Sequence, residues 1–321
     1  MSKKEKFKIA AGAAITAVSI FFMVKVLSGI HPGELFRSNI KWRFVALSIA
    51  VYIAANYVRG LSYTRGIDRS IGRLNAFQIV GIGHALNMVL PFNAGEGLRA
   101  VFFPDDFSAI KRAKLLIIPA TADVASILLI SLLAVPFAGF RDPGLLRALW
   151  ILFFIFIFTV PGGLIVAAVF FMPKLRSYAG EYINTGTVKM LFWVILSWVM
   201  LLISTWLGIM AFGFHLGESV RLALAVYSTT NILNFIPAAP GALGIFEYGA
   251  VLALTGLGTE QSKAILMALL LHLIQYASLL PLAGVLYITA LRGKYGDTLR
   301  RLRHRRKEDT VKSEKTEDIK I

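Results

Sequence analysis

Six long apolar runs constrain the fold of this chain more than any other feature. Each has about 20 residues or more, the length that an α-helix needs to cross the hydrocarbon core of a bilayer. The runs cover residues 7–27, 42–61, 115–137, 148–171, 188–212 and 264–291. Only 16% of the residues are charged, against roughly 25% in soluble domains. The sequence therefore predicts an all-α polytopic membrane protein, in which residues 1–291 form one membrane domain and residues 292–321 a basic, disordered tail.

The composition excludes several kinds of site. No cysteine is present, so disulfides, thiolate metal sites and cysteine nucleophiles are excluded. The five histidines lie far apart and lack metal-ligand spacing, and we expect neither a metal nor a cofactor. Much of the net charge of +16 comes from loops and from the tail. A basic segment directly after a membrane helix is typical of the cytoplasmic face, where it contacts anionic lipid headgroups. We therefore expect no nucleic acid partner.

The distribution of Lys and Arg predicts the orientation in the membrane. With both ends placed in the cytoplasm, the inside segments hold 25 of these residues and the outside segments hold seven. Because cytoplasmic loops carry an excess of Lys and Arg, both termini are predicted to be cytoplasmic, which requires an even number of crossings. We expect a multi-pass protein of the plasma membrane. Its first helix is expected to be retained, because no A-x-A cleavage site follows residues 7–27.

Two further apolar stretches, 74–103 and 222–256, are each interrupted in the middle. Each is too long for one helix and too short for two full spans with a turn. The residues that break them are Pro91, Gly95 and Gly97 in the first and Pro237, Pro240, Gly241 and Gly244 in the second. Two half-helices of about 12 residues would each reach roughly 18 Å, just past the middle of a core of about 30 Å. The sequence predicts two re-entrant helical hairpins with tips buried in protein or facing a wet cavity.

The two halves of the chain resemble each other. The stretches NMVLPFNAGE (87–96) and NFIPAAPGALGIFE (234–247) share an Asn, a Pro, a Gly four residues after that Pro, and a Glu. Three full spans accompany each stretch in the same order, so repeat one covers about residues 7–138 and repeat two about 148–291. Since three is odd, the second repeat must lie inverted and the hairpins enter from opposite sides. Many transporters have this plan, with substrate sites at the broken helices.

These two motifs also resemble a known family. N-x-x-x-P-x-x-x-G-E at 87–96, with P-x-x-P-G-x-x-G-x-x-E at 237–247, is similar to the lysylphosphatidylglycerol synthase transmembrane family, or flippase-like membrane domain, over about residues 7–291. The resemblance implies a protein that moves a polar lipid between leaflets or serves a lipid-modifying pathway. The soluble aminoacyl transferase domain of some relatives is not among these residues, so we expect no synthesis of aminoacylated lipid. Asn93 and Phe246 stand where such sequences often carry Arg, and Ala242 replaces a Gly, which weakens the inference of a strongly anionic headgroup.

Three charged residues at the breaks are candidates for binding a lipid headgroup. Glu96 and Arg99 would be neighbours on the first turn of a half-helix starting near Ala94. Arg99 and the helix N-terminus would attract a phosphate, and Glu96 would bind an amine or take up a proton. A local ion pair is the alternative. Glu247 is the counterpart of Glu96 in the second motif, and it would either line the same cavity or bond to a backbone group freed at the tip.

Four polar residues complete the candidate substrate site. Asn87 and Asn234 precede the breaks, where their amides would satisfy freed backbone groups or contact substrate. Asn93 lies at the first break. Asp123, on the helix after the first hairpin, needs a cavity or a partner, and Arg99 is one candidate. A proton relay through Asp123 is the alternative.

Other polar residues on the apolar helices have simpler interpretations. Arg59 and Tyr63 fit anchoring at the membrane interface, the usual role of such residues near the end of a span. His84 and His272 fit hydrogen bonds between helices.

The predicted function is translocation of a polar lipid or phospholipid through a cavity lined by the two broken helices. Alternating exposure of the two halves would be the mechanism. A secondary transporter of a small solute would suit the same architecture. A membrane accessory subunit, on whose tail a lipid-synthesis enzyme docks, is a further alternative. An intramembrane enzyme would need a nucleophile or a paired acid and base, for which only Glu96, Glu247 and Asp123 qualify, so we do not expect an enzyme.

Overall fold

The computed structural model describes residues 39–68, 70–90, 94–103, 107–139, 185–234 and 240–317, with a few helical positions between 143 and 154. Every regular element in this part of the chain is helical. Four segments are long and apolar enough to cross a membrane, namely Trp42–Ile67, Lys111–Ala138, Thr185–Met210 and Gln261–Ala290. They confirm a helical membrane protein and match four of the six predicted spans. The run 7–27 and most of 148–171 lie outside the described residues.

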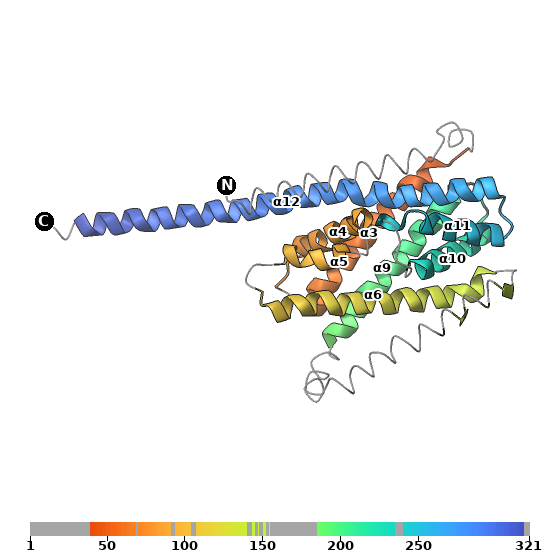
Figure 1. Cartoon of the computed structure of the whole chain (residues 1–321). Helices are drawn as coiled ribbons and strands as arrows, with labels where there is room; N and C mark the ends of the chain where they lie inside the picture. Colours follow the sequence, from red (N-terminus) through yellow and green to blue (C-terminus); the bar gives the residue numbers. More distant parts are fainter. Residues whose placement is uncertain are drawn as a thin grey trace, which may run out of the picture.

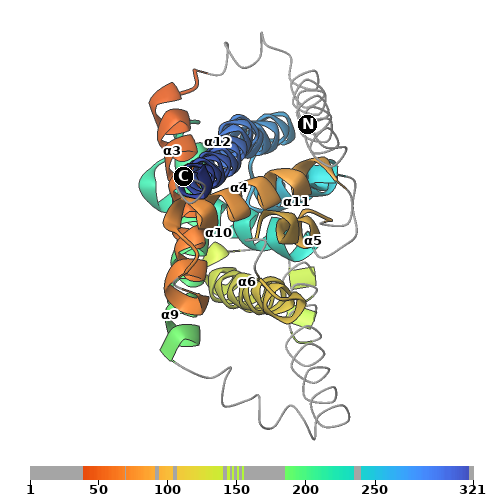
Figure 2. The ribbon, with the colours of Figure 1, turned by 90° about the vertical axis from the view of Figure 1, so that its left-hand side faces the viewer.

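Four long helices surround two broken ones (Figure 1). The long helices are α3 (Trp42–Ser62), α6 (Ala109–Ala138), α9 (Thr185–Met210) and α12 (Gln261–Glu317). The first broken helix consists of α4 (Arg73–Val89), α5 (Ala94–Leu98) and the 3-10 turn η3 (Arg99–Phe102). The second consists of α10 (Leu216–Leu233), the turn η4 (Pro240–Ala242) and α11 (Ile245–Gly256). In both ribbon views the broken helices lie between α12 and α6 (Figures 1 and 2).

Local chemistry sets several of the helix ends. Ser108 caps α6, because its Oγ accepts the N–H of Lys111 at 3.3 Å. At the other end, Gly139 adopts the left-handed conformation that commonly terminates a helix. The π-helical turn η1 (Tyr63–Ile67) ends α3, and the loop after it is tied to α6 by the ion pair between Asp68 and Lys111 at 2.5 Å.

Helices α3 and α9, which correspond in the predicted repeats, run antiparallel. Ser48 on α3 and Ser204 on α9 bond to each other reciprocally, each Oγ donating to the other's backbone carbonyl at 2.7 and 2.9 Å. Further along α3, Arg59 Nε donates to Ser197 Oγ at 2.7 Å, so a step forward on α3 is a step backward on α9. The corresponding pair α6 and α12 also run in opposite directions (Figure 1). An inverted repeat requires this relation.

Each broken helix packs against a long helix from the other half of the chain. Helix α4 lies against α12, where Gln78 Nε2 donates to Thr289 Oγ1 at 3.1 Å. Helix α10 lies against α6, where Ser228 Oγ donates to the carbonyl of Ser131 at 3.2 Å. Within each broken helix the two arms pack side by side, α4 with α5 and α10 with α11. The chain therefore folds back at both interruptions, and helices from its two halves pack between one another.

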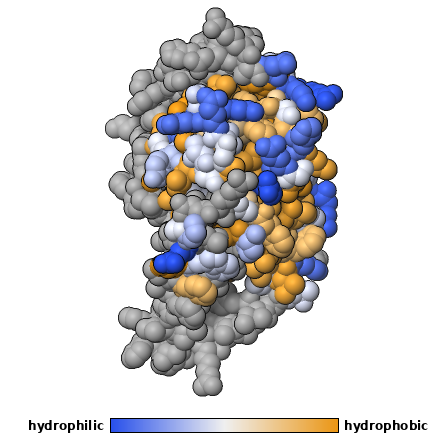
Figure 3. Space-filling model, turned by 90° about the vertical axis from the view of Figure 1, so that its right-hand side faces the viewer, coloured by the Kyte–Doolittle hydropathy of each residue, from blue (hydrophilic) through white to orange (hydrophobic). Residues whose placement is uncertain are grey.

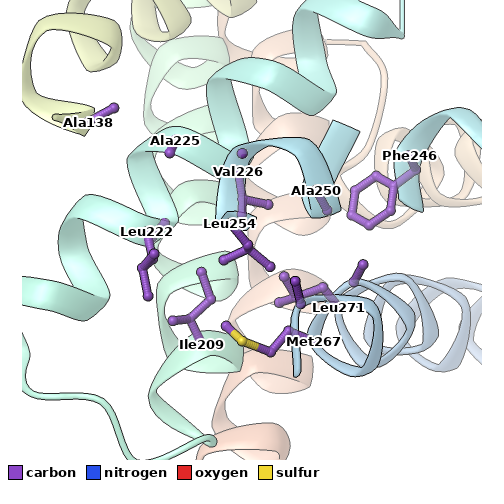
Figure 4. Close-up of a cluster of buried hydrophobic side chains, with 14 residues drawn as sticks. Ala138, Ile209, Leu222, Ala225, Val226, Phe246, Ala250, Leu254, Met267 and Leu271 are labelled. Atoms are coloured by element: carbon purple, nitrogen blue, oxygen red, sulfur yellow. The ribbon is translucent and has the colours of Figure 1, made fainter. Parts of the chain in front are cut away.

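The largest apolar cluster lies where α9, α10, α11 and α12 meet (Figure 4). Large side chains such as Ile209, Leu254 and Met267 fill it, and small residues such as Ala225 and Ala250 separate them. Within a bilayer, close packing of this kind and hydrogen bonds between helices hold helices together, because lipid tails are as apolar as the side chains. The second broken helix thus packs on one side against a dense apolar cluster. Its tip makes the polar contacts described below.

Hydrophilic side chains cover part of the end of the molecule at which α10 begins and α11 ends (Figure 3). Exposed polar residues of the described segments there include Lys41, His215, Glu218 and Glu260. Apolar side chains lie beside them in the same view. In Figure 1 the first hairpin opens towards the other end, where α6 begins. The two hairpins are therefore connected to the rest of the chain at opposite ends.

Two features differ from the sequence-based expectations. The arms are unequal, since α4 has 17 residues and α10 has 18, whereas α11 has 12 and α5 only five. The reason is that α10 begins at Leu216, before its apolar stretch, whereas the returning arm of the first hairpin passes into the 3-10 turn η3 after five residues. Helix α12 continues through the basic segment to Glu317, where we expected disorder. No Pro occurs after Pro281, and residues with good helix propensity fill this segment.

Candidate functional site

Two glycines allow the short arm α5 to lie directly on α4. A Cβ atom at Gly95 would overlap the carbonyl oxygen of Gly83 and the side chain of Asn87, and a Cβ at Gly83 would overlap the side chain of Arg99. No larger residue fits at either position without moving α5 away from α4. Because of this close approach, Glu96 and Arg99 lie against α4 within the protein interior.

Glu96 and Arg99 form the ion pair that their spacing predicts. Nη2 of Arg99 lies 2.6 Å from Oε1 of Glu96, and Asn87 Nδ2 donates to the same carboxylate oxygen at 3.0 Å. Only 2% of the Arg99 side chain is exposed, against 35% for Glu96. The carboxylate is therefore the accessible member of the pair, and the guanidinium lies behind it.

Part of the hydrogen-bonding capacity around Arg99 is unused. Arg99 also interacts with Tyr63 at the end of α3. Apart from this contact between the two residues, neither the buried Nε of Arg99 nor the buried hydroxyl of Tyr63 has a hydrogen-bond partner among the described residues. Buried donors are normally paired, because leaving one unpaired costs about 1–3 kcal/mol. The guanidinium of Arg99 is positively charged, and the Tyr63 hydroxyl lies beside it. Together they are suited to bind an anionic group such as a phosphate.

Asp123 is paired with Arg59 rather than with Arg99. Arg59 on α3 donates to the carboxylate of Asp123 on α6, and its guanidinium lies over the ring of Trp198 at 4.7 Å. Trp198 Nε1 also donates to Asp123 at 3.2 Å. Arg59 is only 2% exposed, so the expectation that it anchors the protein at the membrane interface is wrong. It joins α3, α6 and α9 instead.

The same correction applies to Tyr63, which is 1% exposed. Arg59 and Tyr63 are four residues apart and thus lie near each other along α3. Tyr63 reaches the first hairpin and Arg59 reaches Asp123. Together they form a polar connection between the hairpin and the α6–α9 contact.

Glu247 is held at the tip of the second hairpin by two polar groups, the N–H of Gly244 and the imidazole of His272. Its Oε2 accepts the N–H of Gly244 at 2.7 Å, which caps α11, and its Oε1 lies 2.5 Å from Nδ1 of His272 on α12. Nε2 of His272 lies 3.0 Å from the carbonyl oxygen of Gly241. Like Glu96 in α5, Glu247 is the third residue of the returning arm. The predicted bond to a freed backbone group is present, and so is the predicted interhelical bond of His272.

The tips of the two hairpins touch each other. Gly241 adopts a left-handed conformation with φ 65°, and a Cβ atom there would overlap the hydroxyl of Tyr276 and the carbonyl oxygen of Met88. Tyr276 donates to that carbonyl of Met88, at the end of α4, at 3.4 Å. Asn87, next to Met88, reaches Glu96. The contact between the two tips therefore lies one residue from the contact between Asn87 and Glu96.

The remaining candidate residues do not join this network. Asn234 is exposed at the C-terminal end of α10. Pro91, Asn93 and Pro237 lie outside the described residues, and Pro240 begins the turn η4. Sequence reasoning missed Arg59, Tyr63, Trp198 and Tyr276, whose contacts join residues far apart in the chain. The four-residue spacing of Arg59 and Tyr63 was the one signal that could have shown a shared polar face.

The described fold and these contacts define a polytopic helical membrane protein with two broken helices that meet in its interior and carry buried ionisable groups. The chain belongs to the family described as the lysylphosphatidylglycerol synthase TM region, whose family model matches residues 9–283. Searches of curated proteins and of solved structures gave no match. The family associates the chain with the lipid metabolism of a membrane.

Proposed function

We propose that this protein moves a polar lipid or phospholipid between the leaflets of the plasma membrane. The observation that carries the proposal is that each hairpin holds a set of polar groups and that the tips of the two hairpins touch. Tyr63, Arg99, Glu96 and Asn87 form the first set, and Glu247 and His272 the second. Ionisable groups inside a membrane are costly and generally mark a pathway for a polar or charged ligand. The headgroup would follow these two sets of polar groups while the acyl chains stay in the bilayer.

The arrangement of the hairpins supports alternating exposure. In the proposed topology, six helices span the membrane, both termini are cytoplasmic, and the two hairpins are re-entrant and enter from opposite sides. Antiparallel corresponding helices such as α3 and α9 support this inverted plan. Since the tips meet at Gly241 and Met88, separating them on one side or the other would open the polar groups to one leaflet at a time.

The unused donors favour a headgroup that carries a phosphate. Arg99 Nε and the Tyr63 hydroxyl can both donate to phosphate oxygens, and the partly exposed carboxylate of Glu96 lies in front of them. A phosphate bound to Arg99 would compete with Glu96, which would then be free to contact an amine or hydroxyl of the same headgroup. The basic segment 292–317 of α12 would meanwhile contact anionic lipids at the cytoplasmic surface.

A leaflet-exchange assay tests this function. The purified protein is placed in vesicles with fluorescent lipids whose headgroups are anionic, zwitterionic, cationic or glycosylated. A double variant, Glu96→Gln with Arg99→Gln, removes both charges without leaving either unpaired. Gly97→Ala is the matched control on α5, because a Cβ at this exposed position would contact nothing within 4 Å.

We expect exchange that depends on the headgroup, is lost in the double variant and is retained in the control. If the folded protein exchanges no lipid but takes up small phosphorylated solutes, it is a solute transporter instead. If lipid exchange is equally fast in the double variant, Glu96 and Arg99 of the first hairpin are not part of the lipid pathway.

Cysteine labelling tests the topology separately. The chain contains no native cysteine, so Asp105→Cys and Thr259→Cys each provide one reactive site. The proposed orientation predicts labelling of position 105 from the cytoplasmic side and of position 259 from outside. Labelling of position 105 from outside would contradict the inverted plan.

A further inference from the structure

His272 contacts the tip of the second hairpin at two points. Its Nδ1 lies 2.5 Å from Oε1 of Glu247, and its Nε2 lies 3.0 Å from the carbonyl oxygen of Gly241. The imidazole is 1% exposed and lies between the rings of Phe246 and Tyr276, with centroids 4.6 and 4.9 Å away.

These two contacts fix the number of protons at the site. The carbonyl of Gly241 only accepts hydrogen bonds, so Nε2 of His272 must carry a hydrogen. A carboxylate also only accepts, and a neutral imidazole has just one N–H. Therefore either Nδ1 carries a second hydrogen, or Oε1 of Glu247 is protonated and donates to Nδ1. Oε2 is already occupied by the N–H of Gly244. In both cases, Glu247 and His272 together hold one proton more than a neutral histidine and an ionised carboxylate would hold.

We propose that Glu247 and His272 form a proton-binding site that holds the second hairpin tip against α12, and that proton release frees the tip. Without the extra proton, a lone pair of Nδ1 would face the carboxylate, or the other tautomer would place a lone pair of Nε2 against the Gly241 carbonyl. One of the two contacts must then break. Gly241 is the residue that rests on Met88 and Tyr276, so its release would loosen the contact between the two hairpins.

The other groups around the pair would not replace this proton. On α12 itself, Tyr276 is the neighbouring titratable side chain, and Tyr52 on α3 packs against Tyr276. The turn η4 offers the carbonyl of Gly241, and α4 offers the carbonyl of Met88. Among the described residues, Glu247 is the one charged side chain that forms an ion pair or hydrogen bond with the imidazole. The role of this site in coupling lipid movement to protons rests on the proposed function. The presence of the bound proton does not rest on it.

Glu247→Gln is the variant that separates a proton site from a purely structural contact. The amide nitrogen of Gln would donate to Nδ1, its oxygen would accept the N–H of Gly244, and Nε2 of His272 would still donate to Gly241. Every contact is then made with a neutral imidazole and needs no extra proton. We therefore expect this variant to keep the tip closed as pH rises, whereas the wild-type tip opens.

Nitrogen NMR and infrared spectroscopy on the full chain in lipid vesicles test the proton directly. Histidine is labelled with ¹⁵N, and the His272 signals are those lost in His272→Gln. At neutral pH we expect either an imidazolium, or a neutral ring with its hydrogen on Nε2 beside a protonated carboxyl whose infrared band disappears in Glu247→Gln. A neutral ring together with an ionised Glu247 would overturn the proposal.

Labelling of the tip tests the consequence. In Ala242→Cys, the single thiol lies in the turn next to Gly241. Its labelling rate is divided at each pH by that of the exposed Gly97→Cys thiol, which corrects for ionisation of the thiol itself. This ratio should rise by up to about tenfold per pH unit while the proton is being released. With Glu247→Gln added, the ratio should stay low as pH rises. Equal pH profiles in the two proteins would overturn the proposal. Both readouts are independent of lipid exchange, so failure of the exchange assay would leave this proton site standing.

Discussion

Removing Asp123 should destabilise the fold strongly, because it would leave Arg59 charged and buried. Breaking a buried ion pair by removing one partner costs about 3–5 kcal/mol. Arg59 would retain its hydrogen bond to Ser197 and its contact with the Trp198 ring. We therefore expect Asp123→Ala to lower the free energy of unfolding by about 3 kcal/mol, at the lower end of that range. Reversible unfolding of the protein in mixed detergent micelles would measure the change.

The double variant distinguishes an unpaired charge from lost packing. With Arg59→Met and Asp123→Leu together, no charge remains to be paired, and apolar replacement of a buried pair is often neutral or stabilising. The double variant should therefore be more stable than Asp123→Ala. Thr121→Ala is the control on α6, since this exposed hydroxyl bonds only to its own helix at Ile117, and should change stability by less than about 0.5 kcal/mol. A double variant no more stable than Asp123→Ala would refute the reasoning.

Three further predictions concern single positions. Gly95→Ala should separate α5 from α4 and cut lipid exchange, whereas Gly97→Ala should not; equal exchange rates would contradict the packing argument. Burial alone would raise the pKa of Asp68, but hydrogen bonds from Lys111 and Ser70 outweigh it and lower the pKa below its ordinary 3.8. The stability from this pair is then present above that value and lost as pH falls through the lowered pKa; acid unfolding that is unchanged in Asp68→Asn would contradict it. Gly241→Ala should loosen the contact between the tips, seen as faster labelling of a thiol at the turn; unchanged labelling would count against close packing there.

The sequence was sufficient to predict features that depend on neighbouring residues. Glu96 and Arg99 could be paired from their spacing on one helix turn, and the breaks could be located from Pro and Gly. Four of the spans could be located because each contains about 20 apolar residues in succession. These features need no knowledge of how distant segments meet.

Contacts between distant segments could not be predicted in this way. Asp123 and Arg59 are 64 residues apart, and Arg59 stands near the end of an apolar run, where interfacial anchoring is the usual role. His272 and Glu247 lie on different helices, and only the fold shows that both nitrogens of the ring are used. The unequal arms were missed because hydropathy does not show on which side of a break a helix continues.

The central claim, that the meeting hairpins carry a lipid between leaflets, is tested most directly by linking them. Met88 at the end of α4 and Leu243 after the turn η4 share one hydrophobic cluster. In a Met88→Cys, Leu243→Cys variant, a short reducible cross-linker would join the two tips, with each single-cysteine variant treated identically as a control. The account predicts that lipid exchange stops when the tips are linked and recovers when the linker is reduced. Exchange at an unchanged rate in the fully linked protein would contradict it.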